Sequence, residues 1–206
     1  MKTWDEFAKR CATWLPDVPV FTVTDEAFEA ARDFYVETMA WRSDPITVAT
    51  TVVATQDYTI TNPADTEIAA LCAAWLDGEE LDVAKAGELD DYFPGETGTV
   101  EKVWLFTPSS VRLLKTPDIA GQVVKATVAY IPKSTATGIA DDLFTMHWRP
   151  IVHKICGRLM RQKGKPWFDQ ALAAWHDGQA DSLSLGYGSI VGPISRRPYR
   201  VKMAPI

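Results

Sequence analysis

Residues 164–176 read GKPWFDQALAAWH, and the Gly164-Lys165 pair allows two interpretations of this stretch. In a phosphate-binding P-loop, a glycine and four further residues precede Gly-Lys, and a Ser or Thr hydroxyl follows to hold magnesium. Pro166 occupies the place of that hydroxyl, and the preceding glycine, Gly157, has the wrong spacing. The sequence therefore predicts a helical hairpin corner, in which Gly164 ends one helix as a C-cap and Pro166 opens the next.

Helical patterns extend on both sides of this corner. Downstream, Phe168, Leu172 and Trp175 continue an apolar stripe, and upstream a helical period begins at Asp141. Pro150 lies inside the upstream pattern and removes a backbone donor, so we expect a kink or a restart there. The apolar face of the upstream helix consists of Leu143, Phe144, Trp148, Ile151, Val152, Ile155, Leu159 and Met160.

Two more helices are predicted near the N-terminus. Residues 3–6 match a capping box, and the helix they open runs until Pro16. The second helix is expected to begin at Thr24, with two acids in its first turn, and to end near Ser43. The apolar stripes of the two helices are Trp4, Phe7, Cys11 and Trp14, and then Phe28, Ala31, Tyr35 and Thr38.

The middle of the chain changes to short β-branched and alternating runs, which are typical of strands. Asp77-Gly78 is a hairpin turn signal, and residues 81–93 are expected to include a helical turn or two. These runs predict a small antiparallel β domain. They are residues 46–54, 58–60, 68–76, 100–106, 110–114 and 123–131, the last with Val124, Ala126, Val128 and Tyr130 on one buried face.

The last residues, 186–206, contain glycine and proline throughout and show no helical period, so they cannot form a core of their own. They are either disordered or an arm that orders against a partner, and their well-spaced apolar residues favour the arm. Its apolar anchors would be Ile190, Val191, Ile194, Tyr199 and Met203, and its bases, Arg196, Arg197, Arg200 and Lys202, would pair with acids.

The predicted fold class is α+β, with a four-helix bundle-like domain built from the N- and C-terminal helices. A small antiparallel β domain is inserted into it, and an extended C-terminal arm follows. The predicted segments are 1–44 and 139–184 for the two halves of the helical domain, 45–138 for the β domain and 185–206 for the arm.

Composition excludes several classes of protein. The chain has 206 residues, 47% of them hydrophobic, and eight tryptophans, which suffices for a core. It has no apolar run of about 18 residues to span a membrane. Because residues 1–10 (MKTWDEFAKR) contain no apolar segment, we expect no signal peptide. Cys11, Cys72 and Cys156 lie far apart, which argues against a disulfide scaffold and a zinc ribbon. We therefore expect a soluble intracellular protein whose thiols lie in the core.

The net charge of -6 conceals a strong asymmetry along the chain. Residues 17–101 contain nineteen acids and three bases, whereas residues 102–168 contain eleven bases and three acids. Charges segregated in this way attract across a contact. The alternative is a solvated acidic face beside an unrelated basic helix. The basic run consists of Arg149, Lys154, Arg158, Arg161, Lys163 and Lys165.

No constellation typical of catalysis is evident. His153 and Cys156 could share a helix face, but two ligands do not make a zinc site, and His147 lies on another side. Cys156 lies among apolar residues and resembles a core residue more than an activated nucleophile. The sequence therefore predicts no enzyme activity, no cofactor and no metal.

Several short motifs occur in an informative order along residues 3–181. They are residues 30–35, 41–42, 44–46, 76–78, 116–118, 136–144 (ATGIADDLF), 148–149 and 164–167 (GKPW). In this order the chain resembles the head-to-tail adaptor (connector, head-completion) proteins of tailed bacteriophages, particularly the short-tailed kind. The resemblance rests on order and spacing, because none of the motifs is a catalytic signature. Pro150 departs from it, since an ordinary helix former is expected there, and so does the arm after Leu183.

The resemblance implies a virion structural protein at the head–tail interface. It would form an oligomeric ring, expected to be dodecameric, that binds the portal and a tail nozzle or tube protein and continues the DNA channel. Translocating DNA would pass without sequence-specific binding, because surplus acid facing the channel would repel phosphates within the Debye length of about 8 to 10 Å. No membrane contact is expected.

A head-to-tail ring uses two different patches on each subunit, and one acidic and one basic region would suit such a contact. We expect the helix at 149–165 to meet the acidic second helix or the β domain of an adjacent subunit. The predicted interface residues are Arg149, Lys154, Arg158, Arg161, Lys163 and Lys165, with Ile190, Ile194, Arg196, Arg197, Tyr199, Arg200 and Lys202 of the arm.

The alternative function is a small nucleic-acid-binding protein that uses the basic helix 149–165 and the RRPYRVK segment of the arm. The pI of about 5.1 and the lack of a recognisable DNA-binding motif weigh against it. An enzyme ranks third among the possibilities, since the sequence does not bring any two candidate catalytic groups together.

Overall fold

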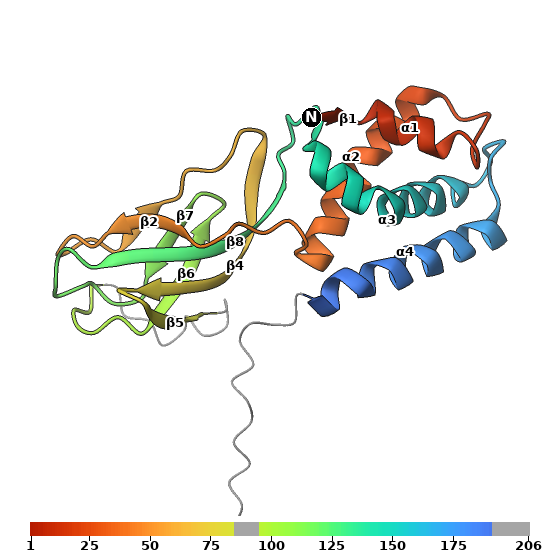
Figure 1. The fold of residues 1–206 in the computed structure, drawn as a ribbon. Helices are drawn as coiled ribbons and strands as arrows, with labels where there is room; N and C mark the ends of the chain where they lie inside the picture. The colour runs from red at the N-terminus through yellow and green to blue at the C-terminus, as the bar shows by residue number, and fades with distance from the viewer. Residues whose placement is uncertain (85–94, 191–206) are drawn as a thin grey trace, which may run out of the picture. The chain divides into compact units, whose positions relative to one another are not determined.

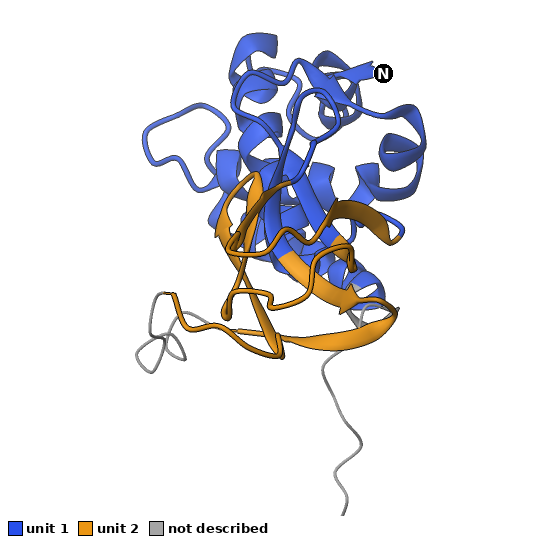
Figure 2. Ribbon diagram, turned by 90° about the vertical axis from the view of Figure 1, so that its left-hand side faces the viewer, with its two compact units in different colours: residues 1–44, 60–70, 128–191 blue, residues 45–59, 71–127, 192–206 orange. Residues whose placement is uncertain are grey.

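A computed structural model describes residues 1–84 and 95–190 (Figure 1). The chain divides into two compact units (Figure 2). The helical unit comprises residues 1–44, 60–70 and 128–190, and the described residues of the sheet unit are 45–59, 71–84 and 95–127. The helices are α1 (Asp5–Cys11), α2 (Val20–Thr38), α3 (Asp141–Met160) and α4 (Gln170–Ile190). The strands are β1 (Lys2–Thr3), β2 (Ile46–Thr50), β3 (Asp57–Thr59), β4 (Thr66–Leu76), β5 (Glu79–Val83), β6 (Lys102–Thr107), β7 (Ser110–Leu113), β8 (Val123–Pro132) and β9 (Gly138–Ile139).

The main sheet is larger than the predicted β domain and is built differently. Its seven strands follow the order β2-β8-β4-β5-β6-β7-β3, and the terminal strands β2 and β3 contact each other, so the sheet nearly closes. β5 and β6 pair in parallel, through Asp82 with Lys102 and Val83 with Val103. The predicted four-helix bundle-like domain with a small antiparallel insert is therefore wrong. Over the described residues, the fold is α+β, with four helices and a large mixed sheet.

The parallel pairing has a physical reason that alternation of residues cannot reveal. A hairpin of two residues forces antiparallel strands, whereas parallel strands need a connection of about a dozen residues or more. Residues 84–101 join β5 to β6, and a connection of this length allows β6 to run in the same direction as β5. Helical turns are predicted within residues 81–93. Residues 81–83 belong to strand β5 instead, and residues 85–94 lie outside the described residues.

The predicted hairpin at Asp77-Gly78 is confirmed. Leu76 of β4 pairs with Glu79 of β5, so the turn contains two residues. Their φ angles are 49° and 89°, both in the left-handed region that tight hairpin turns of this length require. The carboxylate of Asp77 also accepts a hydrogen bond from the backbone N–H of Val123 at 2.7 Å, which fixes the turn against β8.

The core of the helical unit lies where α1, α2 and α3 meet. Phe7, Phe34 and Ile155 are fully buried there, and the Phe7 ring packs edge-to-face on Phe144 with centroids 4.9 Å apart. α4 packs close to α3 at Gly157, because a Cβ atom at this position would lie 2.3 Å from Asp177 Oδ1. Most of the predicted apolar stripes therefore form one shared core, but Trp14, Phe168 and Trp175 of these stripes are exposed.

The N-terminal helix boundaries differ from those predicted. Thr3 pairs with Gly138 in the β1–β9 ladder, so it cannot cap α1, and no side chain caps this helix. The predicted capping box is therefore wrong. α2 begins at Val20, directly after Pro19, and not at Thr24. It ends at Thr38 and not near Ser43, because Met39 adopts a left-handed conformation with φ 49°.

The corner between α3 and α4 is confirmed, but its caps are not the predicted ones. α3 passes through Pro150 without a restart and ends at Met160. Gly164 lies within the connection, with φ +81°, and Pro166 does not open the next helix. The cap of α4 is instead Asp169, whose carboxylate accepts a hydrogen bond from the Leu172 N–H at 2.9 Å.

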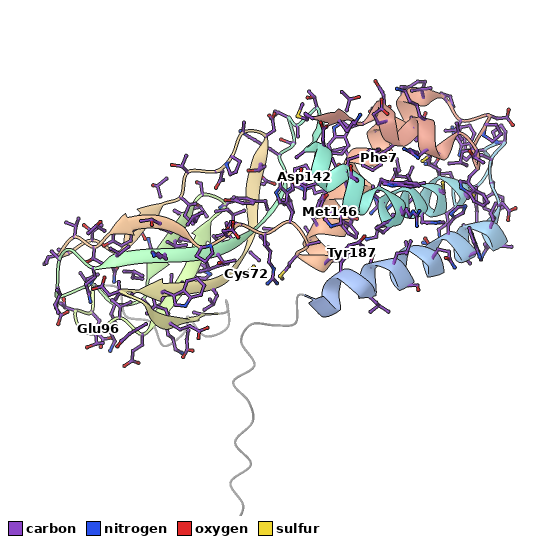
Figure 3. The ribbon with its side chains drawn as sticks, in the orientation of Figure 1. Phe7, Cys72, Glu96, Asp142, Met146 and Tyr187 are labelled. Carbon is purple, nitrogen blue, oxygen red and sulfur yellow. The ribbon has the colours of Figure 1, made fainter. Side chains whose placement is uncertain are left out.

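The predicted extended arm is wrong for its first residues, because α4 continues to Ile190. Tyr187 explains the extension. Its ring packs against Phe34 and His147, and its hydroxyl donates a hydrogen bond to the Met146 carbonyl at 2.7 Å (Figure 3). This contact offsets the low helix propensity of the nearby glycines. Residues 191–206 lie outside the described part of the chain.

Candidate functional site

Three of the predicted interface cations lie in ion pairs within the helical unit. The guanidinium of Arg158 bridges two carboxylates of α2, Glu26 at 2.8 Å and Asp33. Lys154 pairs with Glu37, also on α2. Arg161 pairs with Asp177 on α4. The charge complementarity between the acidic second helix and the basic third helix is therefore satisfied inside one chain.

The spacing of the ion-paired residues in the sequence is a signal from which the pairing of α2 with α3 could have been predicted. Lys154 and Arg158 are four residues apart, so they lie on one face of α3. Glu26, Asp33 and Glu37 follow at intervals of seven and four, which also places them on one face of α2. The two helices are neighbours in the core. Matching stripes of opposite charge on neighbouring helices thus register α2 against α3.

The other predicted interface residues are distributed over several places. Arg149, Lys163 and Lys165 are exposed, and none forms an ion pair within residues 1–84 and 95–190. Lys165 lies over the ring of Trp167, 5.8 Å from its centroid. Ile190 is the last residue of α4. Ile194, Arg196, Arg197, Tyr199, Arg200 and Lys202 lie outside the described residues.

Arg149 belongs to a hollow of about 500 Å³ on the helical unit, which we call the cationic groove. The guanidiniums of Arg10 and Arg149 lie 4.6 and 5.4 Å from the ring centroid of Trp148. Guanidinium groups favour such aromatic faces because the ring carries negative charge above its plane. The groove is lined by Lys9, Arg10, Thr13, Trp14, Trp148, Arg149, Val152 and His153.

Two arginines in this groove have no carboxylate partner among the described residues. Lys9 is paired with Glu6 at 2.5 Å, so it adds little net charge. Arg10 and Arg149 form no ion pair within 1–84 and 95–190. Trp14 is 42% exposed beside them, with its ring 5.5 Å from that of Trp175, itself 44% exposed. The groove thus combines uncompensated positive charge with accessible aromatic surface.

A histidine pair lies at the edge of the groove. The Nδ1 atoms of His153 and His176 are 2.8 Å apart, and His176 is fully buried against the ring of Trp14. Burial, with a smaller contribution from His153, lowers the pKa of His176 to about 4. Burial also lowers the pKa of His153. Both rings are therefore neutral at pH 7, and the positive charge of the groove comes from its arginines.

The described residues contain no group of three or more His, Cys, Asp or Glu side chains that could hold a metal ion. Cys156 is fully buried in the core, as predicted. A hydrogen bond with Cys156, together with burial, raises the pKa of the Cys11 thiol. This thiol is therefore protonated at neutral pH and is a poor nucleophile.

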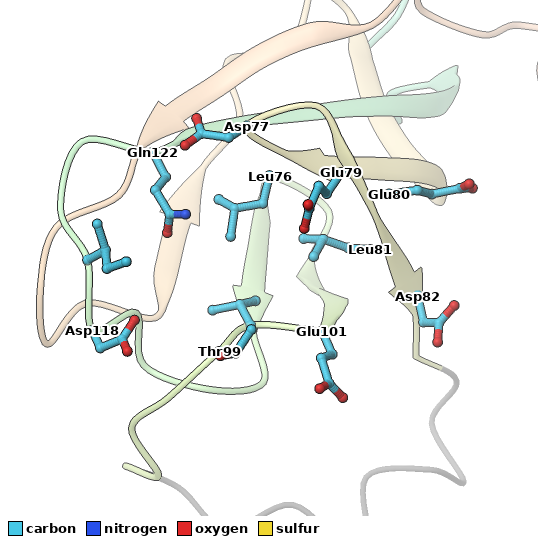
Figure 4. Close-up of a pocket in the computed structure, with 12 residues that line it drawn as sticks. Leu76, Asp77, Glu79, Glu80, Leu81, Asp82, Thr99, Glu101, Asp118 and Gln122 are labelled. Atoms are coloured by element: carbon cyan, nitrogen blue, oxygen red, sulfur yellow. The ribbon is translucent and has the colours of Figure 1, made fainter.

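A second hollow, also of about 500 Å³, lies in the sheet unit and is acidic (Figure 4). At its rim is the tip of the β4–β5 turn, residues 77–80, which we call the acidic hairpin. Asp77, Glu79 and Glu80 are all exposed there. The sequence segment DGEELD signals this feature, although the charge count over residues 17–101 predicts only an acidic region and no particular turn. The carboxylates that line the hollow are Asp77, Glu79, Glu80, Asp82, Glu101 and Asp118.

Neither family models nor curated sequences assign this chain to a family. No protein-family model matches the sequence, and no match is found among curated proteins. Within the described ranges, no helix is both long enough and apolar enough to cross a membrane. The function is therefore inferred from the residues and their geometry.

Proposed function

We propose that the chain is a structural protein of a tailed bacteriophage, an adaptor that forms a ring between the portal and the tail and continues the DNA channel. The order of sequence motifs supports this proposal. It is carried by one observation, that a single chain exposes two features of opposite charge, the cationic groove and the acidic hairpin. A head-to-tail ring needs two different, complementary patches on every subunit.

The distribution of ion pairs agrees with an assembly role. The pairs between α2 and α3 stabilise the helical unit itself, so they need no neighbouring subunit. The groove arginines and the hairpin carboxylates carry charge that these pairs do not use. Such a chain would act through shape and contacts, without a cofactor and without a chemical step. Translocating DNA would pass through the ring without sequence-specific binding.

Native mass spectrometry of the purified chain, alone and mixed with the portal protein of the same genome, tests this proposal. We expect one large species that contains the portal and many copies of the chain, in a ring of twelve if it matches a dodecameric portal. A chain that remains monomeric with the portal at every salt concentration would contradict the proposal. Binding of a tail nozzle or tube protein to the ring would extend it.

The second candidate function is binding of nucleic acid, and the groove provides an observation in its favour. Trp14 offers exposed aromatic surface on which a base could stack, and Arg10 and Arg149 could contact phosphates. Phosphate contacts make affinity fall steeply with salt. Salt-sensitive binding of a DNA fragment by the monomeric chain, lost when both arginines are changed to glutamate, would favour this function over the adaptor.

A further inference from the structure

We infer that the acidic hairpin of one copy inserts into the cationic groove of the next copy, and that this contact closes the ring. The inference rests on the proposed function, because it names the surfaces through which the adaptors associate. It follows from the chemistry of the two features and from the fact that both belong to one chain. The face of α3 that carries Lys154 and Arg158 pairs with α2 of the same chain, so it is not the subunit contact.

The groove has the properties of a receptor for a carboxylate-bearing turn. Arg10 and Arg149 flank the ring of Trp148, so the ring holds both guanidiniums at the wall of a hollow of about 500 Å³. A guanidinium presents its donors as a planar fork that matches a carboxylate. Lys163 and Lys165, which are exposed and form no ion pair within the described ranges, do not line the groove. A partner with carboxylates on a narrow element therefore fits this place best.

The acidic hairpin is such an element. Its turn contains only Asp77 and Gly78, and its two strands lie about 4.8 Å apart, as in any antiparallel pair, so its tip is narrow. Asp77 uses one carboxylate oxygen to hold Val123, which keeps the tip ordered. Glu79 and Glu80 are consecutive in β5 and exposed, so they present carboxylates on opposite faces of the hairpin.

The expected strength of one such contact is modest. Exposed ion pairs are weak individually, and salt screens them. Weak contacts are nevertheless sufficient to form a ring, because the ring repeats the contact and the portal holds neighbouring copies at a high effective concentration. We therefore expect association of the free chain to be weak and salt-sensitive, and to be strengthened by the portal.

Two reversal variants test the inference. The first, Arg10→Glu with Arg149→Glu, makes the groove acidic, and the second, Glu79→Lys with Glu80→Lys, makes the hairpin basic. Each variant alone should associate at least about tenfold more weakly than the wild type, with or without the portal, because every contact becomes repulsive. An equimolar mixture should regain assembly, because the reversed groove accepts the reversed hairpin and the two unreversed surfaces still match. Misfolded variants could not restore each other in this way.

Matched controls carry the same charge changes elsewhere. Lys163→Glu with Lys165→Glu controls for the groove variant, and Asp25→Lys with Glu29→Lys controls for the hairpin variant, since all four residues are exposed. Native mass spectrometry should show wild-type assembly for both controls. If the reversal variants assemble as the wild type does, or if their mixture does not recover, the inference is wrong while the adaptor function stands. If the wild type never assembles with the portal, the proposed function and the inference both fail.

Discussion

The two basic regions of α3 differ in what their charges do. Lys154 and Arg158 face the acidic stripe of α2, where they are compensated by carboxylates of the same chain. Arg149, five residues before Lys154, lies in the cationic groove against Trp148 and has no ion pair among the described residues. One helix therefore carries cations that hold the fold and a cation available to a partner. A run of basic residues in a sequence does not distinguish these two roles.

The largest expected effect separates the two roles directly. Arg158→Glu should lower the free energy of unfolding by about 3 kcal/mol, because it removes two partly buried ion pairs and places a third carboxylate beside Glu26 and Asp33. Arg149→Glu, the same change on the exposed side, should alter it by less than about 0.5 kcal/mol. Equilibrium urea unfolding measures both. Equal losses in the two variants would show that the in-chain pairs do not stabilise the helical unit.

The packing of α3 against α4 provides the next test. Gly157→Val should cost about 2 kcal/mol, because its Cβ would lie 2.3 Å from Asp177 Oδ1 and would displace the carboxylate that pairs with Arg161. Gly178→Ala is the control without a clash, since a Cβ there meets nothing within 4 Å apart from the neighbouring backbone of its own helix. Removing a glycine from the interior of α4 should raise stability by about 0.5 kcal/mol. Thermal unfolding of both variants would show whether α3 and α4 are as close as described.

The histidines predict a loss of stability in acid. The pKa of His176 is about 4 in the folded chain, below its ordinary value of 6.5, because of burial and His153. Between these values the unfolded chain binds the proton better, so this stability is present above pH 6.5 and decreases as the pH falls toward 4. We expect a loss of about 1.5 kcal/mol between pH 7 and pH 5, and a smaller loss in His176→Gln. An unchanged pH profile in this variant would exclude His176 as the cause.

The smallest effects concern helix caps. Asp169→Ala should destabilise the chain by about 1 kcal/mol, because it removes the acceptor for the Leu172 N–H. Thr3→Ala should have almost no such effect, because Thr3 is a strand residue whose side chain caps no helix. Circular dichroism melting curves distinguish the two outcomes. A larger loss in Thr3→Ala than in Asp169→Ala would mean that the capping box forms after all.

Features set by local chemistry could be predicted from the sequence. The β-branched runs, the Asp77-Gly78 turn and the corner at Gly164 all appear where expected, because each depends on residues close in sequence. Helix ends were less predictable. Thr3 satisfies the capping pattern, but pairing with Gly138 engages it elsewhere, and Tyr187 extends α4 through contacts with residues more than 30 positions away.

Features set by long-range pairing could not be predicted. The direction of β6 beside β5 depends on the path of the connecting residues, which leaves no mark on the alternation of either strand. The cationic groove gathers Arg10 and Trp14 from the N-terminal region with Trp148 and Arg149 from α3. In sequence these residues belong to two unrelated segments. Only the docking of α1 against α3 makes them one surface.

The most direct test compares the Arg158→Glu and Arg149→Glu variants with the wild type. The urea unfolding curve of each protein is measured first, and its association with the portal protein is then measured by sedimentation velocity. The comparison shows whether α3 carries one cation that stabilises the fold and another that takes part in assembly. We predict that Arg158→Glu unfolds at lower urea yet still associates while folded, and that Arg149→Glu is as stable as the wild type yet associates more weakly. Association that simply follows stability in both variants would contradict this separation of roles.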